Sequence, residues 1–211
     1  MALLAAGAAH ELNNPLSVIV GYVSLILGGK TAPDRVAEQL QKVQAEAKHC
    51  RLVLESLSQL AEFNRGPIEP LDLTSLLHDV RDEVTELKVV QVGEHNMTTR
   101  GREHGLRLLF LHLLRNARES GARSLEIAAS RLESSLRLQF QDDGAGLPVA
   151  AQRRAKEPFF STKPGAVGLG LTMAELVVTA HGGSLELQSA PGGGTSAVVQ
   201  LPLSPSRGEL K

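Results

Sequence analysis

The chain has 211 residues, 42% of them hydrophobic and 21% charged, with a formal net charge of −1. That composition is ordinary for a globular protein of one large or two small domains. No basic run gives an electrostatic footprint for nucleic acid or an anionic membrane, and no apolar run reaches the roughly 18–20 residues that cross a bilayer. Cys50 is the only cysteine, which excludes a disulfide framework and fits a reducing compartment.

The first predicted element is an amphipathic helix. Its apolar residues recur at alternating steps of four and three, the spacing of a helix–helix seam: Leu12, Leu16, Ile19, Val23 and Ile26. His10 precedes Leu12 by two residues, so it lies about 200° around the helix, toward solvent. Small uncharged residues follow it at helical steps, which leaves room for a partner to dock. The alternative is an ordinary solvated face.

Pro15 lies inside this helix and removes one backbone hydrogen bond, so we expect a local kink beside His10 and Glu11. Gly28 and Gly29 are typical of a helix end. A second helix is predicted from the sequence 31–34, where we expect a capping residue and an early proline.

The second helix has an unbroken apolar heptad pattern that includes Cys50, which we interpret as a small core residue: Val36, Leu40, Val43, Ala47, Cys50, Leu54, Leu57 and Ala61. Two such helices cannot bury their stripes well alone. We therefore predict a helical hairpin over 1–63 that pairs with a second copy into a four-helix bundle.

The periodicity changes after residue 63, and the glycine and prolines of 64–70 predict a linker. A second domain is expected over 71–203, followed by a flexible tail at 204–211. Its predicted helices are 72–87, 105–121 and 169–181, and its predicted strands are 88–93, 97–100, 124–131, 136–141, 184–189 and 195–202. His112 and Asn116, four residues apart, should lie side by side on the polar face of the second of these helices.

Asp142 follows a predicted strand, where its carboxylate could accept a hydrogen bond from an exocyclic amine. Gly144 and Gly146 would let the backbone approach a ligand, although a plain Asp-Gly turn is the alternative. The glycine-rich segment 164–170 opens onto a helix, whose N-terminus favours phosphate, and Lys163 could add a point charge.

Five segments in this order resemble the signature boxes of sensor histidine kinases. They are His-Glu-Leu-Asn-Asn-Pro at 10–15, Leu-Arg-Asn-Ala at 114–117, Asp-Asp-Gly-Ala-Gly at 142–146, Glu-Pro-Phe-Phe-Ser-Thr-Lys at 157–163 and Gly-Leu-Gly-Leu at 168–171. The resemblance implies a dimerisation and histidine-phosphotransfer domain joined to an α/β sandwich of the gyrase, histidine kinase and mismatch-repair ATPase (Bergerat) type. It also implies a cytoplasmic location, alone or as part of a longer sensor.

The resemblance further implies that His10 is phosphorylated by ATP and that Asn116 holds Mg²⁺. Asp142 would bind the adenine amino group, Phe159 and Phe160 would anchor a lid, and Lys163 would contact the phosphates. The full set expected at ATP is His112, Asn116, Asp142, Gly144, Gly146, Phe159, Thr162, Lys163, Gly168, Leu169, Gly170 and Thr195.

Two positions depart from the family pattern. His112 stands where the family has an asparagine, and Ala166 stands where it has a glycine, with Gly165 displaced by one. Because alanine resists the positive φ that a glycine would allow, Ala166 is expected to hinder closure of the lid. It is the one feature that favours the alternative of a non-catalytic phosphorelay adaptor. A related ATPase or serine kinase would have no use for the helix carrying His10.

For the kinase, we expect one ring nitrogen of His10 to act as the nucleophile. Glu11 would hydrogen-bond the other ring N–H and take up its proton. The phosphoryl group would pass to an aspartate of a response-regulator receiver domain docked below His10. Asn14, one turn along, would orient a water that hydrolyses the regulator's acyl phosphate.

Overall fold

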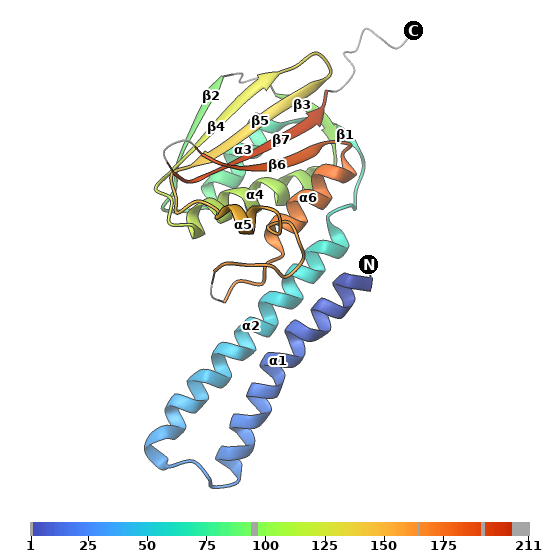
Figure 1. Cartoon of the computed structure of the whole chain (residues 1–211). Coiled ribbons are helices and arrows are strands. Elements are labelled where there is room, and N and C mark those ends of the chain that lie inside the picture. The colour runs from blue at the N-terminus through green and yellow to red at the C-terminus, as the bar shows by residue number, and fades with distance from the viewer. Residues whose placement is uncertain (1, 94–96, 164, 191–192, 204–211) are drawn as a thin grey trace. The chain divides into compact units, whose positions relative to one another are not determined.

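The computed structural model describes residues 2–93, 97–163, 165–190 and 193–203, so the tail expected at 204–211 lies outside the described residues. The chain forms two compact units, which Figure 1 shows. The first combines Met1–Ala61 with Pro158–Leu169, and the second combines Glu62–Glu157 with Gly170–Lys211.

The first unit is built on an antiparallel helical hairpin. Helix α1 (Ala2–Leu27) continues through Pro15, which is buried, and the 3₁₀ turn η1 (Pro33–Arg35) leads into α2 (Val36–Glu62). Gly29 ends α1 with φ 64°, and the Lys30 N–H donates back to the Leu25 carbonyl. Glycine suits this left-handed cap because it has no Cβ.

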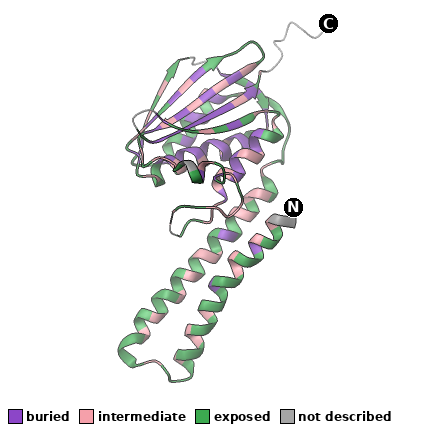
Figure 2. Ribbon diagram, in the orientation of Figure 1, coloured by how far each residue is buried: buried purple, intermediate pink, exposed green. Residues whose placement is uncertain are grey.

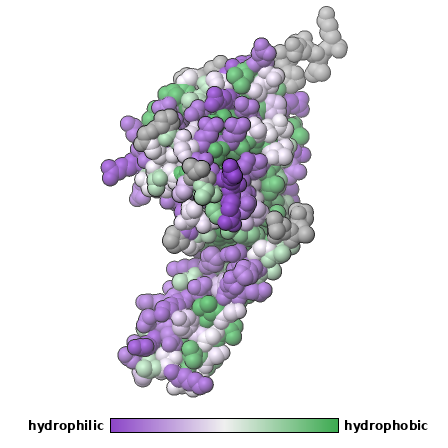
Figure 3. Space-filling view, viewed as in Figure 1, coloured by the Kyte–Doolittle hydropathy of each residue, from purple (hydrophilic) through white to green (hydrophobic). Residues whose placement is uncertain are grey.

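The apolar stripe of α2 divides into two halves. Val36, Val43, Cys50 and Leu57 are half-buried, whereas Leu40, Ala47, Leu54 and Ala61 are exposed. Figures 2 and 3 show this mixture on the hairpin, where exposed hydrophobic side chains lie among hydrophilic ones. In a single copy of the hairpin, one of the two apolar positions in each heptad is thus exposed to solvent.

The second unit contains a five-stranded sheet in the order β2-β4-β5-β7-β6. Its strands are β2 (Lys88–Gly93), β4 (Ser124–Arg131), β5 (Ser135–Asp142), β6 (Ser184–Ser189) and β7 (Thr195–Pro202). β2 pairs with β4 in parallel and the other pairs are antiparallel, so β4–β5 and β6–β7 are hairpins. A separate pair joins β1 (Glu69–Asp72) to β3 (Thr98–Gly101).

Helices α3 (Leu73–Asp82), α4 (Glu103–Glu119) and α6 (Gly170–Ala180) cover one face of this sheet (Figure 1). Alternate residues of β5 are buried, as the period-two pattern requires when one face meets a helical layer. The rings of Phe110 on α4 and Phe140 on β5 lie 5.9 Å apart, and both residues are buried in the core between the helices and the sheet. The second unit is therefore a two-layer α/β sandwich.

Three local features differ from the sequence-based expectation. Strand β1 and the short helix α5 (Val149–Gln152) were not expected, because four residues give too little periodicity to recognise. Helix α3 ends at Asp82 rather than 87, and Asp72 caps it by accepting from the Thr74 N–H. No side chain caps η1, and the Thr31 hydroxyl donates to Gln39 instead.

Candidate functional site

His10 is exposed on α1, on the face opposite the hairpin seam, as its position relative to Leu12 predicts. The amide nitrogen of Asn14 lies 3.2 Å from Nε2 of His10. In the tautomer with the proton on Nδ1, Nε2 carries the lone pair and can accept from this amide N–H. Ser17, Gly21 and Ser24 are exposed along the same face, so the small stripe below the imidazole is open.

Glu11 does not hydrogen-bond the His10 ring, contrary to our expectation. Among the described residues, its carboxylate lies near His49 of α2 instead, with Oε2 3.8 Å from Nε2 of the imidazole. Glu11 lies one residue beyond His10, a step of about 100°, and this rotation turns its side chain toward the second helix.

Asp142 is buried at the end of β5. Its Oδ1 accepts from the backbone N–H of Gly144, at 2.9 Å, and of Thr195, at 3.1 Å. Within the described residues Oδ2 has no protein hydrogen bond. A carboxylate held by one oxygen presents the other to a ligand donor, such as an exocyclic amine.

The glycines around Asp142 are required by close backbone packing. A Cβ on Gly144 would meet Ser120, and one on Gly194 would meet the Asp142 carbonyl. Gly146 has φ 75° and also lies against Gly194. The glycines therefore shape this end of the sheet by allowing backbone segments to approach one another.

His112 and Asn116 share one face of α4, as expected, and both are partly buried. Nε2 of His112 is buried without a hydrogen-bond partner among the described residues. Its Nδ1 would lie 3.4 Å from a Cβ on Gly170, the first residue of α6. Burial, aided by the nearby Arg115 charge, lowers the pKa of His112 from 6.5 to about 4, so the ring is neutral at pH 7.

Phe159, Thr162, Lys163, Gly168 and Leu169 belong to the segment Pro158–Leu169 of the first unit. Phe159 adopts φ 64°, and Gly168, at φ 74°, lies so close that its Cβ would be 2.6 Å from the Phe159 carbonyl carbon. Ala166 is the position where this sequence departs from the family pattern. The neighbouring residue Gly165 has the positive φ, at 74°, and Ala166 does not. The displaced glycine thus takes the left-handed conformation.

Two family models match the chain. The "His Kinase A (phospho-acceptor) domain" matches residues 1–66, and the "Histidine kinase-, DNA gyrase B-, and HSP90-like ATPase" model matches residues 101–205. The chain belongs to the sensor histidine kinase family.

Known histidine kinases resemble nearly the whole chain. Sporulation kinase A of Bacillus subtilis is 29% identical over 94% of this chain and 34% of its own length. The sensory histidine kinase/phosphatase NtrB of Rhodobacter capsulatus is 28% identical over 93% of this chain and 61% of its own length. The chain thus spans about a third of the first relative and less than two thirds of the second.

The solved ATP-binding domain of PrrB from Mycobacterium tuberculosis is 27% identical, with a TM-score of 0.56. It covers 66% of this chain and 99% of its own. The two-layer sandwich is therefore the histidine kinase ATP-binding fold. Within the described residues, no helix has the length and apolarity to cross a membrane.

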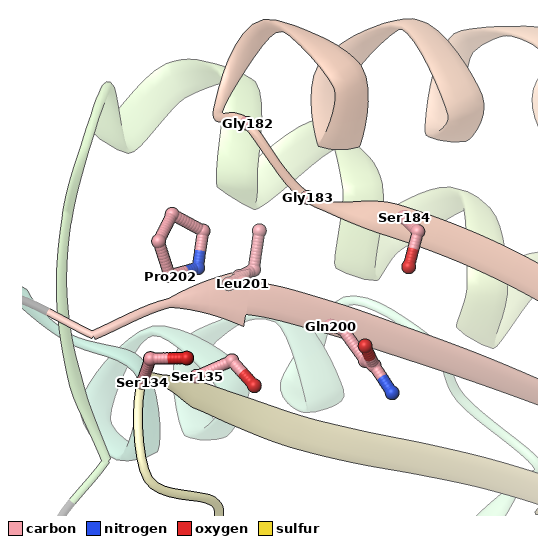
Figure 4. A pocket seen from close by; sticks show the side chains of 8 residues that line it. All are labelled: Ser134, Ser135, Gly182, Gly183, Ser184, Gln200, Leu201 and Pro202. Carbon is pink, nitrogen blue, oxygen red and sulfur yellow. The ribbon is translucent and has the colours of Figure 1, made fainter.

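A pocket of about 370 Å³ lies elsewhere on this histidine kinase sandwich (Figure 4). Ser134, Ser135, Ser184 and Gln200 place hydroxyl and amide groups around it. Ser135 begins β5 and Asp142 ends it, so about 20 Å separates this pocket from the candidate nucleotide site. Among the described residues, the lining of this pocket has no charged side chain.

Sequence reasoning missed several residues that contact the candidate site residues. Ser120 and Gly194 pack against Gly144 and Asp142 but belong to no motif, and His49 lies in a heptad pattern where it attracts no notice. Lys156, in the turn after α5, donates to Glu175 of α6 and to the Leu185 carbonyl of β6, each at 3.0 Å. Only the tertiary contacts identify these residues, because none has a characteristic spacing.

Proposed function

We propose that this chain is an ATP-dependent protein kinase that phosphorylates its own His10. The observation that carries the proposal is the exposed His10 ring, whose Nε2 lies 3.2 Å from the amide nitrogen of Asn14. A neutral imidazole nitrogen is a competent nucleophile. The phosphoacceptor and the ATPase fold on one chain supply the two halves of such a reaction.

In this reaction Nε2 attacks the γ-phosphorus of ATP, the bond from that phosphorus to the bridging oxygen breaks, and ADP leaves. The new N–P bond leaves positive charge on the ring. The Nδ1 proton then passes to a base, and Glu11, the adjacent carboxylate, is the proposed acceptor. The Asn14 amide must leave Nε2 before attack, because the same lone pair forms the new bond.

The nucleotide is proposed to bind at the Asp142 end of the sheet. The oxygen Oδ2 would accept the adenine amino group, while Gly144, Gly146 and Thr195 hold the surrounding backbone in place. Gly170 opens α6, so its helix N-terminus offers N–H groups to phosphate. Thr162, Lys163, Gly168 and Leu169 would close over the phosphates from the lid segment.

The site also offers oxygen donors that suit Mg²⁺, namely the amide oxygen of Asn116 and the phosphates of the bound nucleotide. The described residues contain no cluster of three or more His, Cys, Asp or Glu that would bind a metal alone. Asn116 would hold the ion by its amide oxygen, a donor that Mg²⁺ favours, and the orphaned Nε2 of His112 would face its water shell. Bound there, the ion would neutralise phosphoryl charge during transfer.

A homodimer through the hairpin is the proposed assembly. The exposed Leu16 of α1 and Leu40 and Leu54 of α2 occupy heptad positions, with exposed fractions of 47%, 50% and 56%. Leucines at such positions are buried when two hairpins form a four-helix bundle. The proposed domain limits are 1–63 for this part, 64–70 for the linker and 71–203 for the ATP-binding part.

The proposed partner is a response-regulator receiver domain, which would accept the phosphoryl group on an aspartate. The exposed small stripe of Ser17, Gly21 and Ser24 leaves space for it beside His10. Asn14 is also proposed to orient a water that hydrolyses the acyl phosphate of the receiver, which releases inorganic phosphate. This role fails if Asn14→Ala leaves dephosphorylation of a separately phosphorylated receiver unchanged.

The decisive experiment is incubation with γ-labelled ATP and Mg²⁺, comparing the wild type with His10→Ala. Acid-labile, base-stable label that disappears in the variant is the expected result. No label in a folded wild-type protein that binds ATP would overturn the proposal. Label retained in His10→Ala would place the acceptor elsewhere.

A further inference from the structure

We propose that Lys156 is a positioning residue, which holds the base of the lid segment 158–169 against helix α6. The inference rests on the proposed function, in which this segment closes over the phosphates of the nucleotide. It extends that function to a lysine that lies just outside the five motifs. The chain leaves the second unit after Glu157 and returns to it at Gly170, the first residue of α6.

The side chain of Lys156 is bonded to two other elements. Its Nζ donates to Oε2 of Glu175 on α6 and to the main-chain carbonyl of Leu185 on β6, each at 3.0 Å. The side chains of Lys156 and Glu175 are 35% and 36% exposed, so water screens this ion pair less than a fully exposed one. Hydrogen bonds from an ammonium are charge-assisted and stronger than those between neutral groups. The lysine is thus tied to both α6 and β6.

The main chain of Lys156 is tied to the same helix. The hydroxyl of Thr172, in the first turn of α6, donates to the Lys156 carbonyl at 3.1 Å across 16 residues of sequence. Thr172 is buried, and so is Ala155, the residue before the lysine. Both ends of the lid segment are therefore fixed at the start of α6. One end continues directly into Gly170, and the other is bonded to Thr172 and Glu175.

We call Lys156, Thr172 and Glu175 the lid clasp, because their bonds close the segment into a loop. A loop whose ends are held has fewer open conformations, so it loses less entropy when it closes over a ligand. The first turn of α6 is also where the proposed site offers N–H groups to phosphate. The lid clasp therefore holds the segment beside the phosphates that it would cover. Lys156 acts through the segment and is not proposed to contact the nucleotide.

The first test measures opening of the segment in the nucleotide-free full chain, by chymotrypsin cleavage under native conditions. Chymotrypsin cleaves after aromatic residues, and Phe159 and Phe160 lie in the segment. Phe110 and Phe140 are buried in the core, so cleavage there reports unfolding of the whole unit. When reclosing is fast, the cleavage rate follows the population of the open segment. Lys156→Met should raise cleavage in the segment about 10-fold and leave cleavage in the core unchanged.

The second test measures the affinity of the same proteins for a fluorescent ATP analogue in the presence of Mg²⁺. Lys156→Met should weaken binding about 10-fold. Lys156→Arg keeps the charge and the donors, so its affinity and its cleavage should stay within about 2-fold of the wild type. In the Glu175→Gln background, Lys156→Met should have a smaller effect, because part of the clasp is already lost.

A matched control is Lys42→Met on α2, which removes an ion pair of 2.8 Å with Glu38 far along the chain from the segment. It should leave cleavage and affinity unchanged. If Lys156→Met does not fold, Glu175→Gln takes its place, and it should raise cleavage in the segment about 3-fold without raising it in the core.

Three results would overturn the inference. They are equal increases of cleavage in the segment and in the core, no increase in either, and increased cleavage of the segment with unchanged affinity for the analogue. A wild type that binds no ATP analogue would instead count against the proposed function. The cleavage comparison would then still decide whether the lid clasp holds the segment.

Discussion

Asp142 and Thr195 lie 53 residues apart in sequence, yet Oδ1 of the first accepts the backbone N–H of the second at 3.1 Å. This bond joins the end of β5 to the start of β7, the neighbouring strand of the sheet. It fixes one carboxylate oxygen and leaves the other for a ligand.

Asp142→Asn should weaken ATP binding at least about 10-fold while the protein stays folded. The amide oxygen can still accept from Gly144 and Thr195, but an amide nitrogen facing the ligand cannot accept from an exocyclic amine. Titration with a fluorescent ATP analogue measures the loss. Asp143→Asn is the control, because the Asp143 carboxylate accepts hydrogen bonds from the N–H groups of Arg123 and Ser124 and is not proposed to contact the nucleotide. Equal affinities of the two variants would contradict the assignment.

The free energy of unfolding should fall with decreasing pH below about 6.5, in part through His112. Burial holds the pKa of this histidine at about 4 in the folded protein, against 6.5 for the ordinary group. Between these pH values the unfolded chain binds a proton that the folded protein excludes, so acid favours unfolding by up to about 3 kcal/mol.

Urea denaturation between pH 7 and pH 4 tests this effect by comparing His112→Gln with the wild type. The variant should show a flatter dependence on pH. His104→Gln, at an exposed position of the same helix, should keep the wild-type slope. Parallel curves for His112→Gln and the wild type would show that His112 does not titrate as stated.

Leu54→Glu should dissociate the proposed dimer. The substitution places a charge at an exposed heptad position that a second hairpin would cover, and burying an unpaired charge costs several kcal/mol. Sedimentation equilibrium at micromolar concentration should then give the mass of one chain. Leu132→Glu changes a leucine of similar exposure in the ATP-binding unit and should leave the dimer intact. A monomeric wild type would refute the assembly.

Gly168→Ala should reduce labelling of His10 more than about 10-fold, whereas Ala166→Gly should change it less than about 2-fold. At φ 74° an alanine at 168 is strained, and its Cβ would meet backbone atoms of Phe159 and Phe160. Ala166 is not in the left-handed region, so a glycine there relieves nothing. A large gain of activity in Ala166→Gly would show that Ala166 does restrict the lid.

The sequence by itself determined that a helical hairpin precedes an α/β domain. It also determined the helices, most strands and the five motifs. These rest on local properties: heptad spacing along α2, alternation along β4 and β5, and glycines before α6. The solvent-facing position of His10 also follows from helical geometry, since it needs only the angle between His10 and Leu12.

Only the tertiary structure decided which side chains meet across elements. Glu11 faces His49 because two helices pack side by side, and Gly144 lies against Ser120 because the end of α4 approaches the end of β5. Such contacts depend on packing between segments far apart in sequence, which no local periodicity encodes. The same reason explains why strand β1 escaped prediction, since four residues become a strand only when β3 supplies their partner.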